Sequence, residues 1–216
     1  MLSDHTTNNY EKWCEEWSRR FLTLDQEALV RKIPGLTEDE EFFTLLYYGQ
    51  NYRIRRRTGQ IEGPDASGEP SAFTRLNIYS LIWYCKEQAA LTGEWLPFYR
   101  LKDASPFGPA FQRNVIDVYA RTFSGHSEAL HTACRSLGGQ KLPHSDAGYE
   151  ILSFGCIPIR FLFWDGDEEF PAQANILFDK GSVDFIHVES LVTIASEGLS
   201  LLSKAAGLPL MGNTFS

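Results

Sequence analysis

The sequence predicts an α+β domain in which antiparallel strands, arranged as a meander and a hairpin, pack with several helices. The chain has 216 residues, 43% of them apolar and 13% aromatic, which is enough for one sizeable core. Apolar residues recur at helical spacing near both ends, and inner stretches alternate with a period of two. We therefore expect a single α+β domain over residues 1–206 and a flexible C-terminal tail at 207–216.

The N-terminal segment predicts an amphipathic helix that docks on the core. Its apolar residues Tyr10, Trp13, Cys14, Trp17 and Phe21 recur at helical spacing, and charged residues occupy most of the other face. The segment after this helix carries two helix-start signals. Asp25 is a suitable N-cap for a short helix ending near Lys32, and Thr37 with Glu40 resembles a capping box.

The middle of the chain alternates between strand and helix patterns. Residues 41–62 predict a meander of strands, and apolar residues all around the axis predict a central buried helix over 71–91, ended by Thr92 and Gly93. Further helices are expected at 110–123, at 127–137 and in the C-terminal segment around 191–202, and extended segments at 95–101, 149–154, 157–164 and 172–179.

The last two strands allow a register to be predicted. If Trp164 pairs with Glu169 across the loop Asp-Gly-Asp-Glu, residues Phe163 and Phe170 share one wholly apolar face. A one-residue slip would mix apolar and polar side chains, so this register is favoured. Pro171 cannot donate a backbone hydrogen bond, which predicts that its strand is an edge strand or is bulged there.

Charge and hydropathy exclude several classes of partner. The 20 basic and 28 acidic side chains give a net charge of −8, which disfavours a nucleic-acid partner. The sequence contains no apolar run near the ~20 residues that span a bilayer, and its N-terminus lacks the pattern of a secretory signal. We therefore expect a cytoplasmic protein with no membrane partner.

The four cysteines show no grouping typical of a metal or disulfide site. Cys14, Cys85, Cys134 and Cys156 are scattered, with no CxxC pair, so a zinc ribbon or an iron–sulfur cluster held by this chain is not expected. We interpret them as reduced thiols that pack in the core.

One candidate site is the acidic turn that follows Trp164. Asp165, Asp167, Glu168 and Glu169 supply four carboxylates within five residues. Three interpretations remain open: solvated turn formers whose aspartates bind local backbone N–H groups, partners for arginines inside the fold, and oxygen ligands for a hard cation. The spacing does not match an EF-hand, so we assign no metal.

A second candidate site is the segment Asn-Tyr-Arg-Ile-Arg-Arg-Arg. Strand alternation puts Arg53, Arg55 and Arg57 on one face, about 7 Å apart, where their charges repel unless anions lie between them. Those anions are either carboxylates of the protein itself or a bound phosphate or carboxylate ligand. A third interpretation is that the arginines protect an exposed sheet edge.

The histidines give weaker signals. His131 and Cys134 are three residues apart on a predicted helix, with His126 and His144 nearby in sequence, and metal or haem ligation is chemically conceivable there. Capping or surface roles are the simpler interpretation. His187 would be a general base only if it faced a pocket together with Asp179.

Motifs of the common enzyme classes are missing from the sequence. It contains no GxSxG, P-loop, dinucleotide-binding glycine pattern or HExxH. Whether the protein is an enzyme is therefore left open by its residues.

The segment Trp-Asp-Gly-Asp-Glu-Glu-Phe-Pro-Ala-Gln-Ala-Asn-Ile-Leu-Phe-Asp, at 164–179, resembles a bacterial and archaeal family known as domain of unknown function 3786. Three other segments fall in the order typical of that family: LYYGQNYRI, TGEWLPFYRL and VESLVTIASEGLSLL. The resemblance implies a domain found mostly in anaerobes and sometimes fused behind a four-cysteine iron–sulfur module. This chain differs from those fused members because its N-terminal helix contains only Cys14.

We expect an accessory or ligand-binding domain that holds an anionic cofactor or metabolite, with the arginine strand and the acidic turn as candidate binding residues. The resemblance adds a possible setting in anaerobic cofactor metabolism, with a corrinoid or an iron–sulfur protein as partner. Two alternatives remain: an enzyme acting on a small anionic substrate through the acidic turn 165–169, and a protein–protein interaction module.

Overall fold

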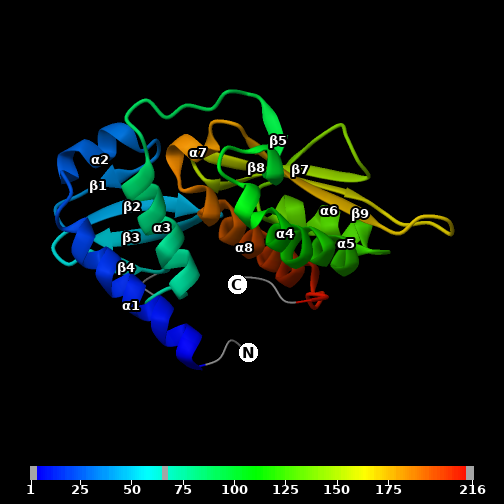
Figure 1. The fold of residues 1–216 in the computed structure, drawn as a ribbon, viewed down its shortest axis with the longest axis horizontal. Helices are drawn as coiled ribbons and strands as arrows, with labels where there is room; N and C mark the ends of the chain where they lie inside the picture. The colour runs from blue at the N-terminus through cyan, green and yellow to red at the C-terminus, as the bar shows by residue number, and fades with distance from the viewer. Residues whose placement is uncertain (1–3, 65–67, 213–216) are drawn as a thin grey trace.

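A nine-stranded antiparallel sheet forms the centre of the fold in the computed structural model, which describes residues 4–64 and 68–212 (Figure 1). The strand order is β4-β3-β2-β7-β8-β9-β5, with β1 paired to β2 and β6 paired to β7. The strands are β1 (Thr37–Glu38), β2 (Phe42–Tyr47), β3 (Gln50–Arg55), β4 (Ile61–Glu62), β5 (Trp95–Pro97), β6 (Gln140–Lys141), β7 (Ala147–Phe154), β8 (Ile157–Trp164) and β9 (Gln173–Asp179). The predicted α+β class with antiparallel strands is confirmed.

The helices pack around this sheet and against one another. They are α1 (Asp4–Phe21), α2 (Gln26–Lys32), α3 (Ala72–Tyr84), α4 (Gly108–Phe111), α5 (Asp117–Phe123), α6 (Ser127–Ser136), α7 (Ser182–Phe185) and α8 (Val188–Ala206), and a π-helical turn over Gln112–Ile116 joins α4 to α5. Helix α1 packs on α3, and α8 packs on both α3 and α6. Figure 1 shows α1 and α3 near the β2–β4 end of the sheet and α5 and α6 near the other end.

The sheet consists of two halves joined at one narrow junction between β2 and β7. Tyr47 pairs with Phe154 there, and the Tyr48 amide donates to the Ser153 carbonyl at 2.6 Å. Helix α8 lies close to this junction, because the Tyr48 hydroxyl donates to the Ile194 carbonyl at 2.7 Å. Gly198 permits this approach, since a Cβ there would collide with the side chains of Tyr48 and Phe161.

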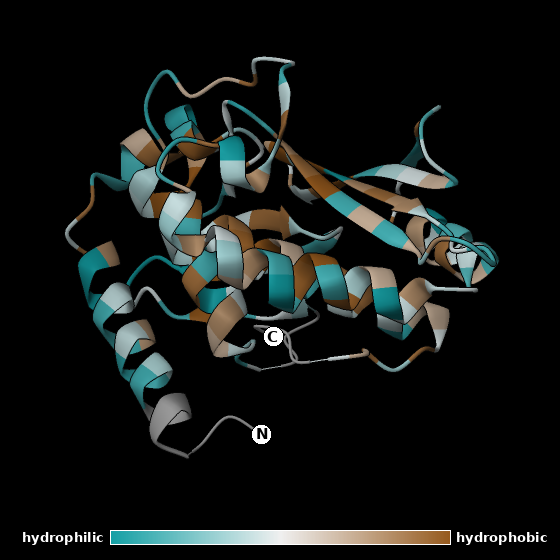
Figure 2. Ribbon diagram, turned by 45° about the vertical axis from the view of Figure 1, so that its right-hand side comes forward, coloured by the Kyte–Doolittle hydropathy of each residue, from teal (hydrophilic) through white to brown (hydrophobic). Residues whose placement is uncertain are grey.

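Apolar residues concentrate along the sheet and on α8, whereas α1 is hydrophilic over much of its length (Figure 2). Cys14, Cys85, Cys134 and Cys156 are all buried free thiols. None of the helices within 4–64 and 68–212 is both long and apolar enough to cross a membrane.

Two predicted helix boundaries differ from the structure. Asp25 caps α2 as expected, accepting from the Glu27 and Ala28 amides, but the capping box at Thr37 is wrong because Thr37 begins β1. The central helix ends at Tyr84 rather than at residue 91. Beyond it, the Lys86 amide binds the Asp184 carbonyl, so a tertiary contact replaces the next helical turn.

The predicted hairpin has the right faces but the wrong register. Trp164 pairs with Gln173, not Glu169, so the apolar face of β8 meets Ile176 and Phe178. The shift is four residues, an even number, and therefore keeps Phe161 and Phe163 on the buried side. Phe170, predicted to be buried beside Phe163, lies in the loop with 62% of its surface exposed.

The longer loop has a clear physical cause. The Asp167 carboxylate accepts from the amides of Glu169 and Phe170, and the Asp165 carboxylate binds the start of α6, so both aspartates are drawn into loop structure. The prediction that Pro171 marks an edge strand is wrong, because Pro171 precedes β9 and β9 is paired on both sides.

The C-terminal segment is tied to the domain as far as it is described. Gly207 ends α8 in the left-handed conformation (φ 68°), and the Leu208 amide binds the Ser203 carbonyl. Met211 bonds to Arg121 and Thr122. Residues 213–216 of the predicted tail lie outside the described residues, so the predicted domain boundary stays a prediction.

Candidate functional site

The arginine strand is paired within the protein. The guanidinium groups of Arg53 and Arg55 bind the two oxygens of Glu62, on the neighbouring strand β4, at 2.6 and 2.5 Å. Both guanidinium groups also lie over the ring of Phe42, at 4.4 and 4.6 Å from its centroid. Arg57 lies beyond the end of β3 and is exposed, so it does not continue the face of the other two.

Arg53 and Arg55 lower the pKa of the Glu62 carboxyl. Burial alone would raise the pKa of its carboxyl, but the hydrogen bonds and charges of Arg55 and Arg53 outweigh burial and lower the pKa. The anion between these two arginines is thus a carboxylate of the protein. The predicted binding of an external anion on this strand stays a prediction.

Asp165 of the acidic turn accepts hydrogen bonds from the segment that begins α6. The Asp165 carboxylate accepts from the Gly125 amide at 2.8 Å and from the Ser127 hydroxyl at 2.5 Å. Burial opposes ionisation of Asp165, but these hydrogen bonds outweigh it and lower the pKa of the carboxyl. Glu168 and Glu169 are exposed, and Trp164 is 39% exposed. Figure 1 places the β8–β9 loop and β3 at opposite ends of the molecule, so the two groups of candidate residues do not form one site.

The histidine and cysteine candidates do not assemble a metal site. The ring of His131 hydrogen-bonds the Tyr149 hydroxyl at 2.9 Å, and burial raises the pKa of the Cys134 thiol to about 12. Within the described residues, no three His, Cys, Asp or Glu side chains lie close enough to hold a metal ion. Asp179, the proposed partner of His187, instead binds the amides of Thr92, Gly93 and Gly181.

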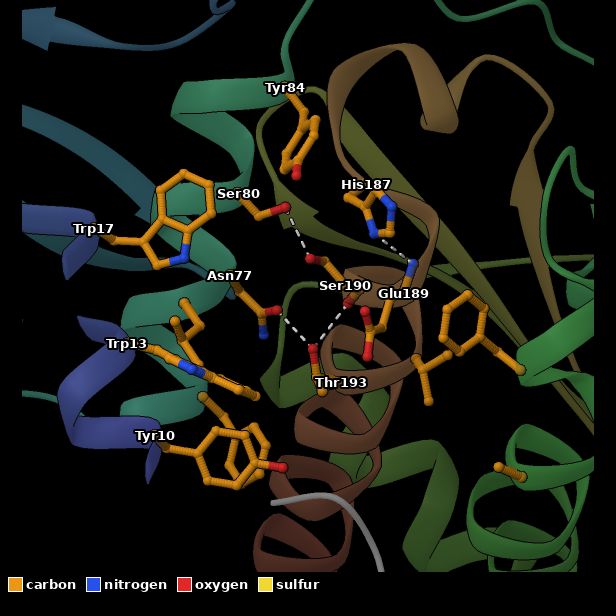
Figure 3. Close-up of a pocket in the computed structure, with 15 residues that line it drawn as sticks. Tyr10, Trp13, Trp17, Asn77, Ser80, Tyr84, His187, Glu189, Ser190 and Thr193 are labelled. Carbon is orange, nitrogen blue, oxygen red and sulfur yellow. Dashed lines mark hydrogen bonds between the residues drawn. The ribbon is translucent and has the colours of Figure 1, made fainter. Parts of the chain in front are cut away.

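A cavity lies elsewhere, between α1, α3, the start of α8 and the segment around α4 (Figure 3). Its volume is about 400 Å³, within the range of small-molecule sites. Six aromatic side chains supply most of its apolar surface: Tyr10, Trp13, Trp17, Phe73, Tyr84 and Phe107. Figure 3 shows the α1 aromatics on one side and the polar residues of α8 on the other.

Helical spacing explains why three aromatic side chains of α1 point into the pocket together. Tyr10, Trp13 and Trp17 are separated by three and four residues, which puts them on one face of α1. That helix is held on α3 by Arg75, whose guanidinium binds both oxygens of Glu11 at 2.7 and 2.6 Å. The sequence pattern predicted α1 as a docking helix, but its aromatic face is shared between the core and a pocket.

The wall opposite α1 is a hydrogen-bonded polar network. The Thr193 hydroxyl donates to the Asn77 side-chain oxygen at 2.6 Å, and the Ser190 hydroxyl donates to Ser80 at 2.8 Å. The Asn77 amide in turn donates to the Glu197 carboxylate at 2.7 Å. These bonds fix the polar wall and link it to an acid behind it.

Glu197 is an acid in an unusual environment. The hydroxyls of Tyr47 and Thr74 each donate to its carboxylate at 2.5 Å. Burial raises the pKa of Glu197, and the hydrogen bonds that it accepts only partly offset the effect. No ion pair involves Glu197 in the part of the chain that the structure describes.

His187 and Glu189 lie at the N-terminal end of α8 and border the pocket. His187 is the N-cap of α8, and its Nδ1 accepts from the Glu189 amide at 3.3 Å, which assigns the proton of the neutral ring to Nε2. The ring lies 5.1 Å from that of Tyr84. Glu189 is exposed and, among the described residues that line the pocket, is the only acid, and none of these residues is Lys or Arg.

The sequence contained faint signals of this site. Asn77 stands between Leu76 and Ile78 in a largely apolar helix, and Glu197 stands among Ile, Ala, Leu and Ser in α8. A polar residue on an apolar helix face needs a partner when buried, so both positions indicated a polar network. Their partners were not identifiable because they lie 120 residues apart.

A family model described as "Domain of unknown function (DUF3786)" matches residues 25–199. Since the match covers most of the chain, the protein belongs to this family. Searches with this chain found no matching curated protein and no matching solved structure. The matched residues include the α3 and α8 walls of the pocket, whereas α1, with Trp13 and Trp17, precedes them.

Proposed function

We propose that this member of the DUF3786 family is a ligand-binding domain, and that its ligand occupies the aromatic pocket between α1, α3 and α8. One observation carries the proposal. The pocket combines six aromatic side chains with a pre-formed wall of hydrogen-bonded Asn77, Ser80, Ser190 and Thr193. Apolar surface supplies binding free energy and a few placed polar groups orient a ligand, which is the usual composition of a small-molecule site.

This proposal places the site away from the residues that the sequence suggested. The arginine strand and the acidic turn do not line this pocket. Within the pocket, no serine, cysteine or carboxylate forms a hydrogen-bonded pair with a histidine side chain in the described structure, so binding is supported better than catalysis. A corrinoid or iron–sulfur partner stays an expectation from the family resemblance.

Native mass spectrometry of protein purified from its own host tests the proposal. The wild type should retain added mass from a bound small molecule. Ala110→Phe fills the pocket with a benzyl group at a half-buried lining position and should reduce the retained fraction about tenfold or more.

Ala205→Phe is the matched control, because Ala205 is exposed near the end of α8 and outside the pocket. It should retain the ligand like the wild type. Equal retention by Ala110→Phe and Ala205→Phe would place any ligand elsewhere and reject the proposed site.

A further inference from the structure

We infer that the pocket binds an organic cation, specifically a ligand with a substituted or quaternary ammonium group seated between the α1 aromatics and Glu189. This inference rests on the proposed function and specifies its ligand class. Three independent features of the pocket carry it: its charge, its exposed aromatic faces and the direction of its hydrogen bonds.

The charge of the lining residues favours a cation. Glu189 is the only carboxylate among them, and the lining contains neither Lys nor Arg within the residues that the structure describes. The positive end of the α8 dipole also borders the pocket, but Glu189 occupies its first turn and offsets that partial charge.

The aromatic faces match the size and chemistry of an alkylammonium group. A cation within about 6 Å of a ring centroid is attracted by the ring quadrupole, most strongly over Trp. Trp13 lines the pocket with 52% of its surface exposed, and Tyr10 and Trp17 flank it on the same helix face. At the outer end of this cluster the Arg20 guanidinium, which is paired with Glu16, lies 5.0 Å from the Trp17 centroid.

Two hydroxyls of the polar wall keep acceptor lone pairs for a ligand. The Ser190 hydroxyl hydrogen is used on Ser80, and the Thr193 hydroxyl hydrogen is used on Asn77. The Asn77 amide is used on Glu197 and on the Tyr47 hydroxyl. Lone pairs on Ser190 and Thr193 therefore remain for a ligand, which suits an ammonium group or its polarised methyl groups, and donors remain on Ser80 and on Nε2 of His187.

Choline is a suitable probe, because an uncharged isostere exists in which a tert-butyl group replaces the trimethylammonium group. Saturation-transfer NMR on the methyl resonances, at low ionic strength, should give an affinity for choline about tenfold or more above that for the isostere. Acetate and inorganic phosphate should not compete. Equal affinity for the two isosteres, or no choline signal at tens of millimolar, would overturn the cation inference.

Pairs of matched variants test whether Glu189 and Trp13 are responsible for choline binding. Glu189→Gln should weaken choline binding several-fold and leave the isostere unchanged, whereas Glu128→Gln removes an exposed carboxylate from the first turn of α6 and should change neither. Trp13→Leu should weaken choline binding about tenfold, and the exposed Trp164→Leu should not. Unchanged choline affinity in both Glu189→Gln and Trp13→Leu also overturns the inference.

Failure of the cation inference can be distinguished from failure of the pocket as a ligand site. If Ala110→Phe abolishes binding of the isostere and of choline alike, while the two bind equally to the wild type, the pocket is a ligand site and only the cation class is wrong. If the mass retained in native spectra is insensitive to Ala110→Phe, the proposed function fails whatever choline does.

Discussion

The arginine face of β3 and the aromatic pocket differ in whether their polar groups are paired within the protein. Arg53 and Arg55 form a conspicuous cationic pattern in the sequence, yet both bind Glu62 on the adjacent strand. The pocket has no conspicuous motif, yet Trp13 is half exposed, and Ser190 and Thr193 of the polar wall keep unused lone pairs. A dense charge pattern therefore indicates a binding site only when its partners are missing from the fold.

The two regions also differ in their distance along the chain. Arg53 and Glu62 are nine residues apart, so a local meander brings them together. Asn77 and Thr193 are separated by 116 residues, and only the packing of α3 on α8 joins them. Four predictions test how far these regions behave as separate units.

The largest expected effect comes from the core that supports both regions. Phe163 is fully buried and packs on Tyr119, with ring centroids 5.8 Å apart. Phe163→Ala should lower the free energy of unfolding by about 3–5 kcal/mol through lost burial and a cavity. Urea unfolding followed by circular dichroism and by tryptophan fluorescence should show one coincident transition, because one core serves both regions.

Phe170→Ala is the control for this prediction. Phe170 is 62% exposed, so its truncation should change stability by no more than about 0.5 kcal/mol. A large loss in Phe170→Ala would mean that the shorter loop predicted from the sequence is the correct one.

A smaller effect is expected where α1 docks. The Arg75 side chain is only 9% exposed and holds Glu11, so Arg75→Ala should cost about 1–3 kcal/mol through lost packing and hydrogen bonds. The fluorescence of Trp13 and Trp17 should shift to the red as α1 loosens, and choline binding should weaken. Arg19→Ala removes an exposed arginine from the same helix and should do neither.

Glu62→Gln should affect the arginine face alone. The pair with two half-exposed arginines is expected to contribute about 1 kcal/mol. The variant leaves Arg53 and Arg55 without their shared anion, so inorganic phosphate should raise its melting temperature more than that of the wild type. Glu41→Gln, at an exposed position 4.0 Å from Arg55, is the control. An equal phosphate shift in the wild type would support the anion site predicted from the sequence.

The smallest effect is a contrast in pH dependence. The folded pKa of Glu62 is lowered, so its stabilising contribution is present above the unfolded value of about 4.5 and is lost as the pH falls through the folded pKa. The folded pKa of Glu197 is raised, so its contribution is present below the unfolded value and is lost as the pH rises through the folded pKa.

Unfolding free energies measured across the acidic range should separate the two carboxylates. Glu62→Gln should flatten the loss of stability toward low pH, and Glu197→Gln should flatten the loss toward neutral pH. Parallel pH profiles for the two variants would show that the environments of the two acids do not differ in the way described.

Local patterns predicted the secondary structure well because they depend on near neighbours. Asp25 binds amides two and three residues away, and the docking face of α1 repeats within each turn. The end of α3 was not predictable in this way. Its final turn is replaced by contacts with Asp184, which lies 98 residues from Lys86.

The sequence by itself determined the α+β class, the order of the main elements and the apolar face of β8, because hydropathy periods and short-range capping specify them. The family followed from the resemblance of whole segments such as residues 164–179. Only the tertiary structure decided that Glu62 neutralises Arg53 and Arg55, that β9 shifts by four residues, and that α1, α3 and α8 enclose a pocket. An even register shift preserves the hydropathy pattern, and a pocket is the space between packed helices. Neither leaves a periodic trace in the residues that form it.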